Sequence, residues 1–192
     1  TQGKTALKRL LLGSTAEEVI RGARIPVLVL GPKVRSKPSP RKQIVLASDL
    51  GSNSIRAEAF AAKLAAKIKA PVLIVYSLFE GMHPVLQNAL ASSRPPRELL
   101  ALYQSALRDA EKKLEKKVAA FARRGIRASF RVDSRSTSAS QTIVDRARPA
   151  QASMIVMGTH GRNLLAKAFL GSTLRGVILN SSVPVAVIRS RG

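Results

Sequence analysis

Short apolar runs alternate with amphipathic stretches along most of this 192-residue chain. Apolar runs of ~4–8 residues bounded by turn residues are typical of buried strands, and apolar residues at helical spacing are typical of helices with one buried face. Strands that alternate with helices form parallel sheets covered on both faces. The pattern therefore predicts an α/β fold with an open parallel five-stranded sheet and helices on both faces.

The expected elements lie between residues 43 and 192. Five apolar runs predict strands at Gln43–Ser48, Val72–Ser77, Ile126–Val132, Met154–Met157 and Pro184–Ile188. Helical spacing of apolar residues predicts helices at Ile55–Lys69, Arg97–Arg124, Ser138–Arg148 and Ser172–Asn180. Residues 80–96 contain a glycine and several prolines, which indicates a loop.

A repeat links the two ends of the sequence. The segment Gly3–Thr15 recurs as Gly161–Thr173, 158 residues later, and the same register continues to a Pro-Val pair at residues 26 and 184. The first copy has no domain in front of it, whereas the second has a whole domain. We therefore expect a C-terminal fragment of a first repeat at residues 1–31, a basic, proline-rich linker at 32–42 and a complete second repeat at 43–192.

A glycine motif, Gly158-x2-Gly161-x9-Gly171-Ser172, follows directly after the fourth predicted strand. Glycines let the backbone come close to a phosphate chain and turn its N–H groups toward it. Ser172 is a favourable N-cap for the helix that follows, and the start of a helix attracts anions. Because open α/β sheets bind ligands beyond the carboxyl ends of their strands, the motif predicts a phosphate-binding site.

This motif is similar to the ATP-binding signature of the universal stress protein family. The similarity covers residues 43–192, and residues 3–31 resemble the final third of that family. The resemblance implies an adenine nucleotide alpha hydrolase-like (Rossmann-like) fold and an ATP-binding regulatory module of the stress response, with Mg²⁺ accompanying the nucleotide. Ser153 stands where the family usually has an acidic residue, and Ala47 where proline is common; neither change removes a ligand.

The resemblance also implies the residues that bind the nucleotide. Asp49 would bind the ribose hydroxyls, Ser77 would place a backbone group near adenine, and the glycines with their neighbours would surround the phosphates. The complete predicted set is Ala47, Ser48, Asp49, Ser77, Met157, Gly158, Gly161, Arg162, Gly171, Ser172 and Thr173.

Some of these residues have simpler interpretations. An Asp that follows a strand, such as Asp49, commonly forms a turn by bonding its own backbone. His160 has no evident carboxylate or nucleophile beside it and is interpreted as a loop residue. His83 lies far from it in the sequence, so we predict no metal site. With no catalytic residue to name, a non-enzymatic role with at most slow hydrolysis or autophosphorylation is favoured.

The charge of the chain supports a second hypothesis. Lys and Arg number 33 against 11 Asp and Glu, for a formal net charge of +22. Such an excess attracts polyanions, nucleic acid among them. The alternative function is therefore a non-catalytic scaffold with a vestigial nucleotide site, whose basic surface binds a polyanion or a partner protein. An aromatic content of 4% leaves little material for stacking on bases.

The last strands of the two copies have a predicted role in association. The resemblance implies association through the last strands, in antiparallel fashion across a two-fold axis, so we expect Pro26–Leu30 and Pro184–Ile188 to pair in this way; an unpaired apolar edge would promote aggregation. They would do so inside one chain, as a pseudo-dimer, or between chains, as a homo-oligomer. No apolar run approaches the ~20 residues that span a bilayer. The absence of cysteine fits a reducing compartment, and we expect a cytoplasmic location.

Overall fold

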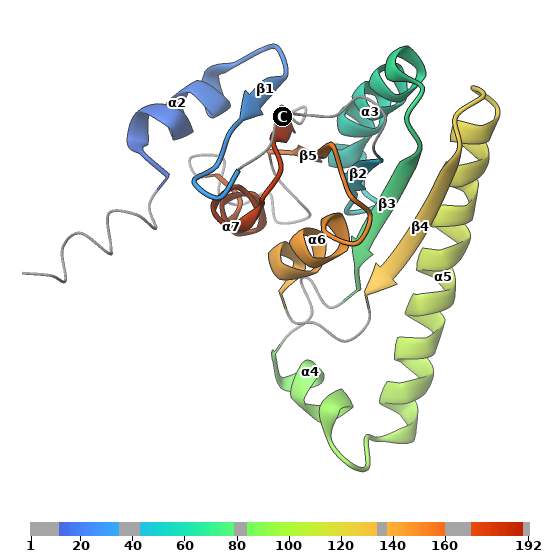
Figure 1. The fold of residues 1–192 in the computed structure, drawn as a ribbon. Helices are drawn as coiled ribbons and strands as arrows, with labels where there is room; N and C mark the ends of the chain where they lie inside the picture. Colours follow the sequence, from blue (N-terminus) through green and yellow to red (C-terminus); the bar gives the residue numbers. More distant parts are fainter. Residues whose placement is uncertain (1–11, 35–42, 79–83, 134–137, 160–169, 190–192) are drawn as a thin grey trace, which may run out of the picture.

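The protein is a three-layered α/β structure in which helices cover both faces of a twisted sheet (Figure 1). It is known from a computed structural model that describes residues 12–34, 43–78, 84–133, 138–159 and 170–189. The strands are β1 (Val27–Val29), β2 (Ile44–Ala47), β3 (Val72–Ser77), β4 (Ala128–Asp133), β5 (Met154–Gly158) and β6 (Val185–Ile188). The helices are α2 (Ser14–Gly22), α3 (Ile55–Ile68), α4 (Pro84–Ala91), α5 (Arg97–Ala122), α6 (Ala139–Ala147) and α7 (Ser172–Asn180), with a 3-10 turn η1 (Ser52–Ser54).

The strands of the described residues lie in the order β1-β6-β5-β2-β3-β4. All neighbours from β6 to β4 are parallel, so the predicted open parallel sheet with helices on both faces is confirmed. The predicted count of five strands is wrong, because β1 adds a sixth strand, antiparallel to β6. This is the antiparallel pairing of the two last strands inside one chain that the sequence predicts. It covers the apolar edge that the Val-Ala-Val-Ile segment of β6 would otherwise expose.

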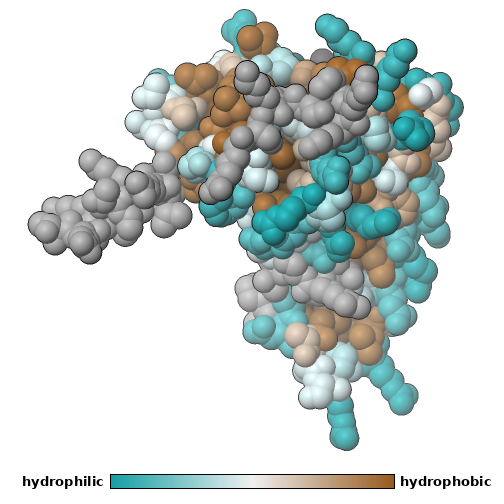
Figure 2. Space-filling model, viewed as in Figure 1, coloured by the Kyte–Doolittle hydropathy of each residue, from teal (hydrophilic) through white to brown (hydrophobic). Residues whose placement is uncertain are grey.

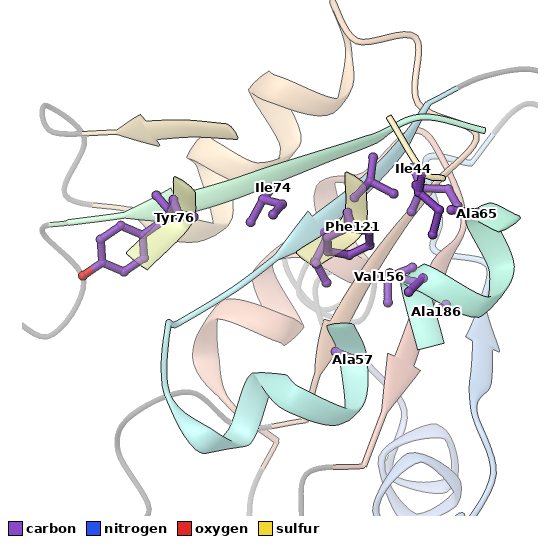
Figure 3. Close-up of a cluster of buried hydrophobic side chains, with 14 of the residues drawn as sticks. Ile44, Ala57, Ala65, Ile74, Tyr76, Phe121, Val156 and Ala186 are labelled. Atoms are coloured by element: carbon purple, nitrogen blue, oxygen red, sulfur yellow. The ribbon is translucent and has the colours of Figure 1, made fainter. Parts of the chain in front are cut away.

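The core lies on both faces of the sheet because successive strand residues point to opposite sides. Ile44 and Leu46 of β2 pack with α3 and α5, in the cluster that Figure 3 shows around Phe121 and Ala65. Val45 and Ala47 of the same strand pack on the other face with α6 and α7. All four β2 residues are buried, as expected for the central strand of a doubly covered sheet.

The structure corrects the loop predicted for residues 80–96, since Pro84–Ala91 form the helix α4. Proline fits the first position of a helix, and the seven residues that follow it contain neither glycine nor proline. The first turns of α5 are more exposed than its helical pattern indicates, and Leu102 is 66% exposed. Figure 1 shows the reason: this end of α5 extends past the sheet toward α4. None of the described helices is long and apolar enough to cross a membrane.

The described parts of the two copies of the repeat have the same local structure. Helices α2 and α7 begin and end at positions 158 residues apart. Their N-caps, Gly13 and Gly171, have φ/ψ of −58/147° and −56/140°. Their C-caps, Ala23 and Ser181, are both extended, and their N–H groups donate to Val19 and Val177 respectively. The repeat in the sequence is therefore also a repeat of helix geometry.

Candidate functional site

The carboxyl ends of β2 and β5 meet at the point where the chain changes direction across the sheet. From β2 the chain continues to β3 and β4 on one side, and from β5 it continues to β6 on the other. The two strands are paired in parallel, with Leu46 opposite Val156. Connections that leave adjacent strands in opposite directions open a crevice at their carboxyl ends, where α/β proteins bind ligands. Most of the predicted site residues lie at this edge.

Asp49 closes the turn that follows β2. Its Oδ1 accepts a hydrogen bond from the N–H of Gly51 at 2.9 Å and another from the hydroxyl of Ser54. The Ser54 Oγ in turn accepts from the N–H of Asp49 at 2.9 Å. Leu50 has a φ of 61°, a left-handed conformation that the surrounding bonds must hold in place. The turn-forming interpretation of Asp49 is confirmed, and its contact with ribose stays a prediction.

Ser48 connects this turn to the helices that cover the sheet. Its hydroxyl donates to Glu58 Oε1 at 3.1 Å and accepts from the N–H of Leu50 at 3.2 Å. Lys117 of α5 forms an ion pair with the same Glu58 oxygen at 2.6 Å. Both charged side chains are largely buried, with exposed fractions of 20% for Lys117 and 17% for Glu58. The start of the turn is thereby fixed to α3 and α5.

Ser77 ends β3 at the same edge of the sheet. The residue is only 8% exposed, and its Oγ has no hydrogen-bond partner among the described residues. A buried hydroxyl without a partner costs ~1–3 kcal/mol, so native proteins rarely contain one without a reason. Ser77 is therefore a polar group available to a ligand at this edge.

The start of α7 lies against the end of β5. The N–H of Gly171 donates to the carbonyl oxygen of Thr159 at 3.4 Å, and Thr159 donates in turn to Ile188 of β6 at 3.0 Å. The prediction that Ser172 caps this helix is wrong: Gly171 is the N-cap, Ser172 is the first helical residue, and no side chain caps the helix. The first turn of α7 contains no acidic residue, so no carboxylate there offsets the positive end of the helix dipole.

The structure brings most of the predicted residues together at this edge. Ala47 and Met157 are buried in one apolar cluster on the α6–α7 face, and Gly158, Gly171 and Thr173 are half-buried. Gly161 and Arg162, like His160 and His83, lie outside the described residues. Within the described part of the chain, no group of three His, Cys, Asp or Glu could hold a metal ion.

Three residues of the site were missed by sequence reasoning. Ser54 and Glu58 fix the turn around Asp49, and the carbonyl oxygen of Thr159 accepts a hydrogen bond from the N–H of Gly171 at the start of α7. A serine a few residues after a turn-forming Asp is a signal that could have identified Ser54, because such hydroxyls bond the preceding turn. Nothing in the local sequence marks Glu58, since its partner on α5 is 59 residues away.

Comparison with known proteins identifies this arrangement. The model of the universal stress protein family matches residues 1–31 and 40–189. The chain belongs to the universal stress protein family. No curated protein matches it in a sequence search.

Solved structures of universal stress proteins have the same fold. A universal stress protein from Archaeoglobus fulgidus in complex with dAMP is 26% identical, with a TM-score of 0.52, over 80% of this chain and 100% of the other. Universal stress protein UspA from Lactobacillus plantarum is 18% identical with a TM-score of 0.58, over 82% and 100%. A longer universal stress protein from Archaeoglobus fulgidus DSM 4304 is 22% identical with a TM-score of 0.63; the match covers 96% of this chain but 56% of that protein.

Proposed function

We propose that residues 43–192 bind ATP and act as a nucleotide-dependent regulatory module of the stress response, with at most slow hydrolysis. The observation that carries this proposal is the start of α7, which has no side-chain cap and lies against the end of β5 at the point where the chain changes direction. Backbone N–H groups in the first turn of a helix have no intrahelical partner and attract phosphate. Gly171, Ser172 and Thr173 would contact the phosphates there, and Gly161 and Arg162 would complete that part of the site.

The sugar and the base would lie toward β2 and β3. A carboxylate can accept about four hydrogen bonds, so Asp49 can hold its turn and also accept from ribose hydroxyls. The buried hydroxyl of Ser77 would gain a partner in the ligand or its water. Ala47 and Met157 would give the pocket its apolar wall, and Ser48 and Gly158 would border it.

The dAMP complex of a universal stress protein 26% identical to this chain supports an adenine nucleotide as the ligand. ATP is proposed over AMP because the motif Gly158-x2-Gly161-x9-Gly171-Ser172 is similar to the ATP-binding signature of the family, and glycines let the backbone come close to a phosphate chain. Mg²⁺ would be held mainly by the phosphates and water, as is usual for nucleotide-bound magnesium, since the described residues offer no group of three His, Cys, Asp or Glu that could hold a metal ion. We propose the cytoplasm as the location, because ATP is abundant there.

Calorimetric titration with MgATP tests the proposal. Asp49→Asn keeps an oxygen for the Gly51 N–H but removes the charge that favours ribose hydroxyls as donors, so we expect affinity to fall about tenfold. Asp109→Asn, an exposed Asp on α5, is the matched control and should bind like the wild type. Equal affinity of both variants for MgATP would contradict the assigned site.

We also propose that residues 1–31 are the C-terminal fragment of a first repeat, joined by a linker at 32–42 to the complete repeat at 43–192. The model of the family matches residues 1–31 and 40–189 as two separate stretches, which supports this division.

Five apolar residues of the complete repeat have smaller exposed fractions than their counterparts 158 positions earlier, in residues 12–34. Val19, Leu28 and Leu30 are 54%, 52% and 66% exposed, whereas Val177, Ala186 and Ile188 are at most 5% exposed. Ile25 and Val29 are likewise less covered than Val183 and Val187. Figure 2 shows apolar surface on the side formed by α2 and β1.

A polyanion-binding scaffold is the second candidate, and one part of α5 and its following loop favours it. Six basic side chains are exposed there: Lys112, Lys113, Lys116, Arg123, Arg124 and Arg127. Each neutralised phosphate releases counterions, so such binding would weaken steeply as salt rises. Retention on duplex or single-stranded nucleic acid at low salt, lost near physiological salt, would support the scaffold. Absence of retention at low salt would remove it.

A further inference from the structure

The contact between β1 and β6 has the symmetry of a two-fold dimer inside one chain. Leu28 lies opposite Ala186, and these two residues occupy the same position of the repeat, 158 residues apart. On either side of this pair the counterparts are crossed. Val27 lies opposite Val187, the counterpart of Val29, and Val29 lies opposite Val185, the counterpart of Val27. A local two-fold axis therefore passes between Leu28 and Ala186. Residues 12–34, which we call the N-terminal unit, meet the α7–β6 face of the domain across it.

In a two-fold interface, residues close to the axis meet their own counterparts. Glu17 of α2 and Arg175 of α7 occupy the same position of the repeat, and they form a salt bridge across this interface. The carboxylate side chain is 14% exposed and the guanidinium side chain 37%. The pair is thus partly shielded from water, where charge interactions are stronger than at an open surface.

The rest of the interface is mainly apolar and closely packed. Ile20 and Ile178, again equivalent positions, are buried in the same cluster with 2% and 0% exposure. Gly31 approaches the carbonyl oxygen of Ile178 so closely that a Cβ on this glycine would lie 1.9 Å from it. The Ile20–Ile178 contact would suit a symmetric pair of domains equally well. The Gly31 contact would not, because the equivalent position of the complete repeat is Arg189, which has a Cβ.

We propose that the Glu17–Arg175 pair makes this interface selective for two unlike halves. If two copies paired symmetrically through β6, Arg175 would meet Arg175 of the second copy at the same place, and like charges would oppose the contact. The partner that fits the α7–β6 face is therefore a helix–strand unit with a carboxylate at the position of Glu17. The N-terminal unit of this chain meets that requirement. This selectivity is independent of nucleotide binding.

A charge swap in the full chain tests the proposal. We expect Glu17→Arg and Arg175→Glu each to speed hydrogen exchange of the β1 amides about tenfold, because like charges then face each other. The double variant E17R/R175E restores opposite charges and should return exchange close to the wild-type rate. Glu18→Arg, at an exposed neighbouring position, is the control and should leave exchange unchanged. A double variant that exchanges as fast as the single variants would overturn the proposal.

Mixing the single variants tests selectivity between chains. In a mixture, Arg175 of the E17R chain can meet Glu17 of the R175E chain, whose N-terminal unit would then lie on the α7–β6 face of the E17R chain. We therefore expect a species of twice the chain mass, measured by light scattering, in the mixture and in neither variant alone. If either variant alone formed that species as readily as the mixture, charge at this position would not select the partner.

Discussion

The N–H of Gly171 donates to the carbonyl oxygen of Thr159, so the first and last parts of the glycine motif are adjacent although twelve residues apart. This contact joins the start of α7 to the end of β5. Because Thr159 is also bonded to Ile188 of β6, the start of the helix is fixed to two neighbouring strands. Such hydrogen bonds suit a site whose donors are backbone N–H groups. The direction of an N–H group is set by the backbone, and no side-chain rotation can turn it toward a ligand.

The first prediction concerns Ser77. Its Oγ is buried and has no hydrogen-bond partner among the described residues. Ser77→Ala therefore removes no hydrogen bond among those residues, and it removes the free-energy cost of burying an unpaired hydroxyl. We expect unchanged or slightly higher thermal stability together with MgATP affinity reduced ~3–10-fold. Thermal unfolding and calorimetric titration of the same variant measure both. A variant that is destabilised but binds normally would show that the hydroxyl has a structural role instead.

Gly31 and Gly22 form a matched pair for the N-terminal unit. A Cβ at Gly31 would meet the backbone of α7, which cannot move aside cheaply, whereas nothing lies within 4 Å of a Cβ at Gly22. We expect Gly31→Ala to displace β1 and expose it to hydrogen exchange. Gly22→Ala, at the last residue of α2, should be neutral or stabilising by up to ~1 kcal/mol. Similar exchange in both variants would rule out the close approach of residue 31 to α7.

Gly176 allows α7 to pack closely on α6. A Cβ at this position would lie 2.6 Å from the Oγ and 2.7 Å from the Cβ of Ser140. We expect Gly176→Ala to destabilise the protein by ~1–3 kcal/mol, although alanine favours helix by up to ~1 kcal/mol. Chemical denaturation measures this cost. If the clash with Ser140 causes the loss, Gly176→Ala should cost less unfolding free energy in an S140G background than in the wild type. An equal cost in both backgrounds would count against the steric explanation.

Lys117 is expected to support the turn after β2 through Glu58. Lys117→Met keeps most of the side-chain volume but leaves the largely buried carboxylate of Glu58 without its ion-pair partner. We expect a loss of about 1 kcal/mol in unfolding free energy, because the pair is partly shielded from water. Lys116→Met, at an exposed neighbouring position, should change stability by less than ~0.5 kcal/mol. Equal effects of the two substitutions would mean that the ion pair contributes nothing.

The sequence predicts elements well where periodicity and turn residues agree. The bounds of β3 and α7 were predicted to the residue, because each is an apolar run between clear start and stop signals. The pairing of β1 with β6 was predicted from the resemblance, which implies association through the last strands, and the repeat identifies the two strands concerned. Helix α4 was missed because the prolines around it masked a short run of good helix formers.

The candidate site was predictable only in part. The glycine motif and Asp49 are local patterns, whereas the Ser48–Glu58–Lys117 connection depends on how α3 and α5 pack over β2. The salt bridge between Glu17 and Arg175 spans the whole repeat distance of 158 residues. It follows from the two-fold relation of β1 and β6, and no feature near either residue indicates it.

The nucleotide content of the purified full chain tests the central claim most directly. The protein would be denatured, and the released supernatant separated and quantified for adenine nucleotides. The account predicts a stoichiometric amount of adenine nucleotide, or, if the protein is purified empty, saturable binding of added MgATP. A protein that is empty and also fails to bind added MgATP would contradict the nucleotide site and favour the basic scaffold, while leaving the fold unaffected.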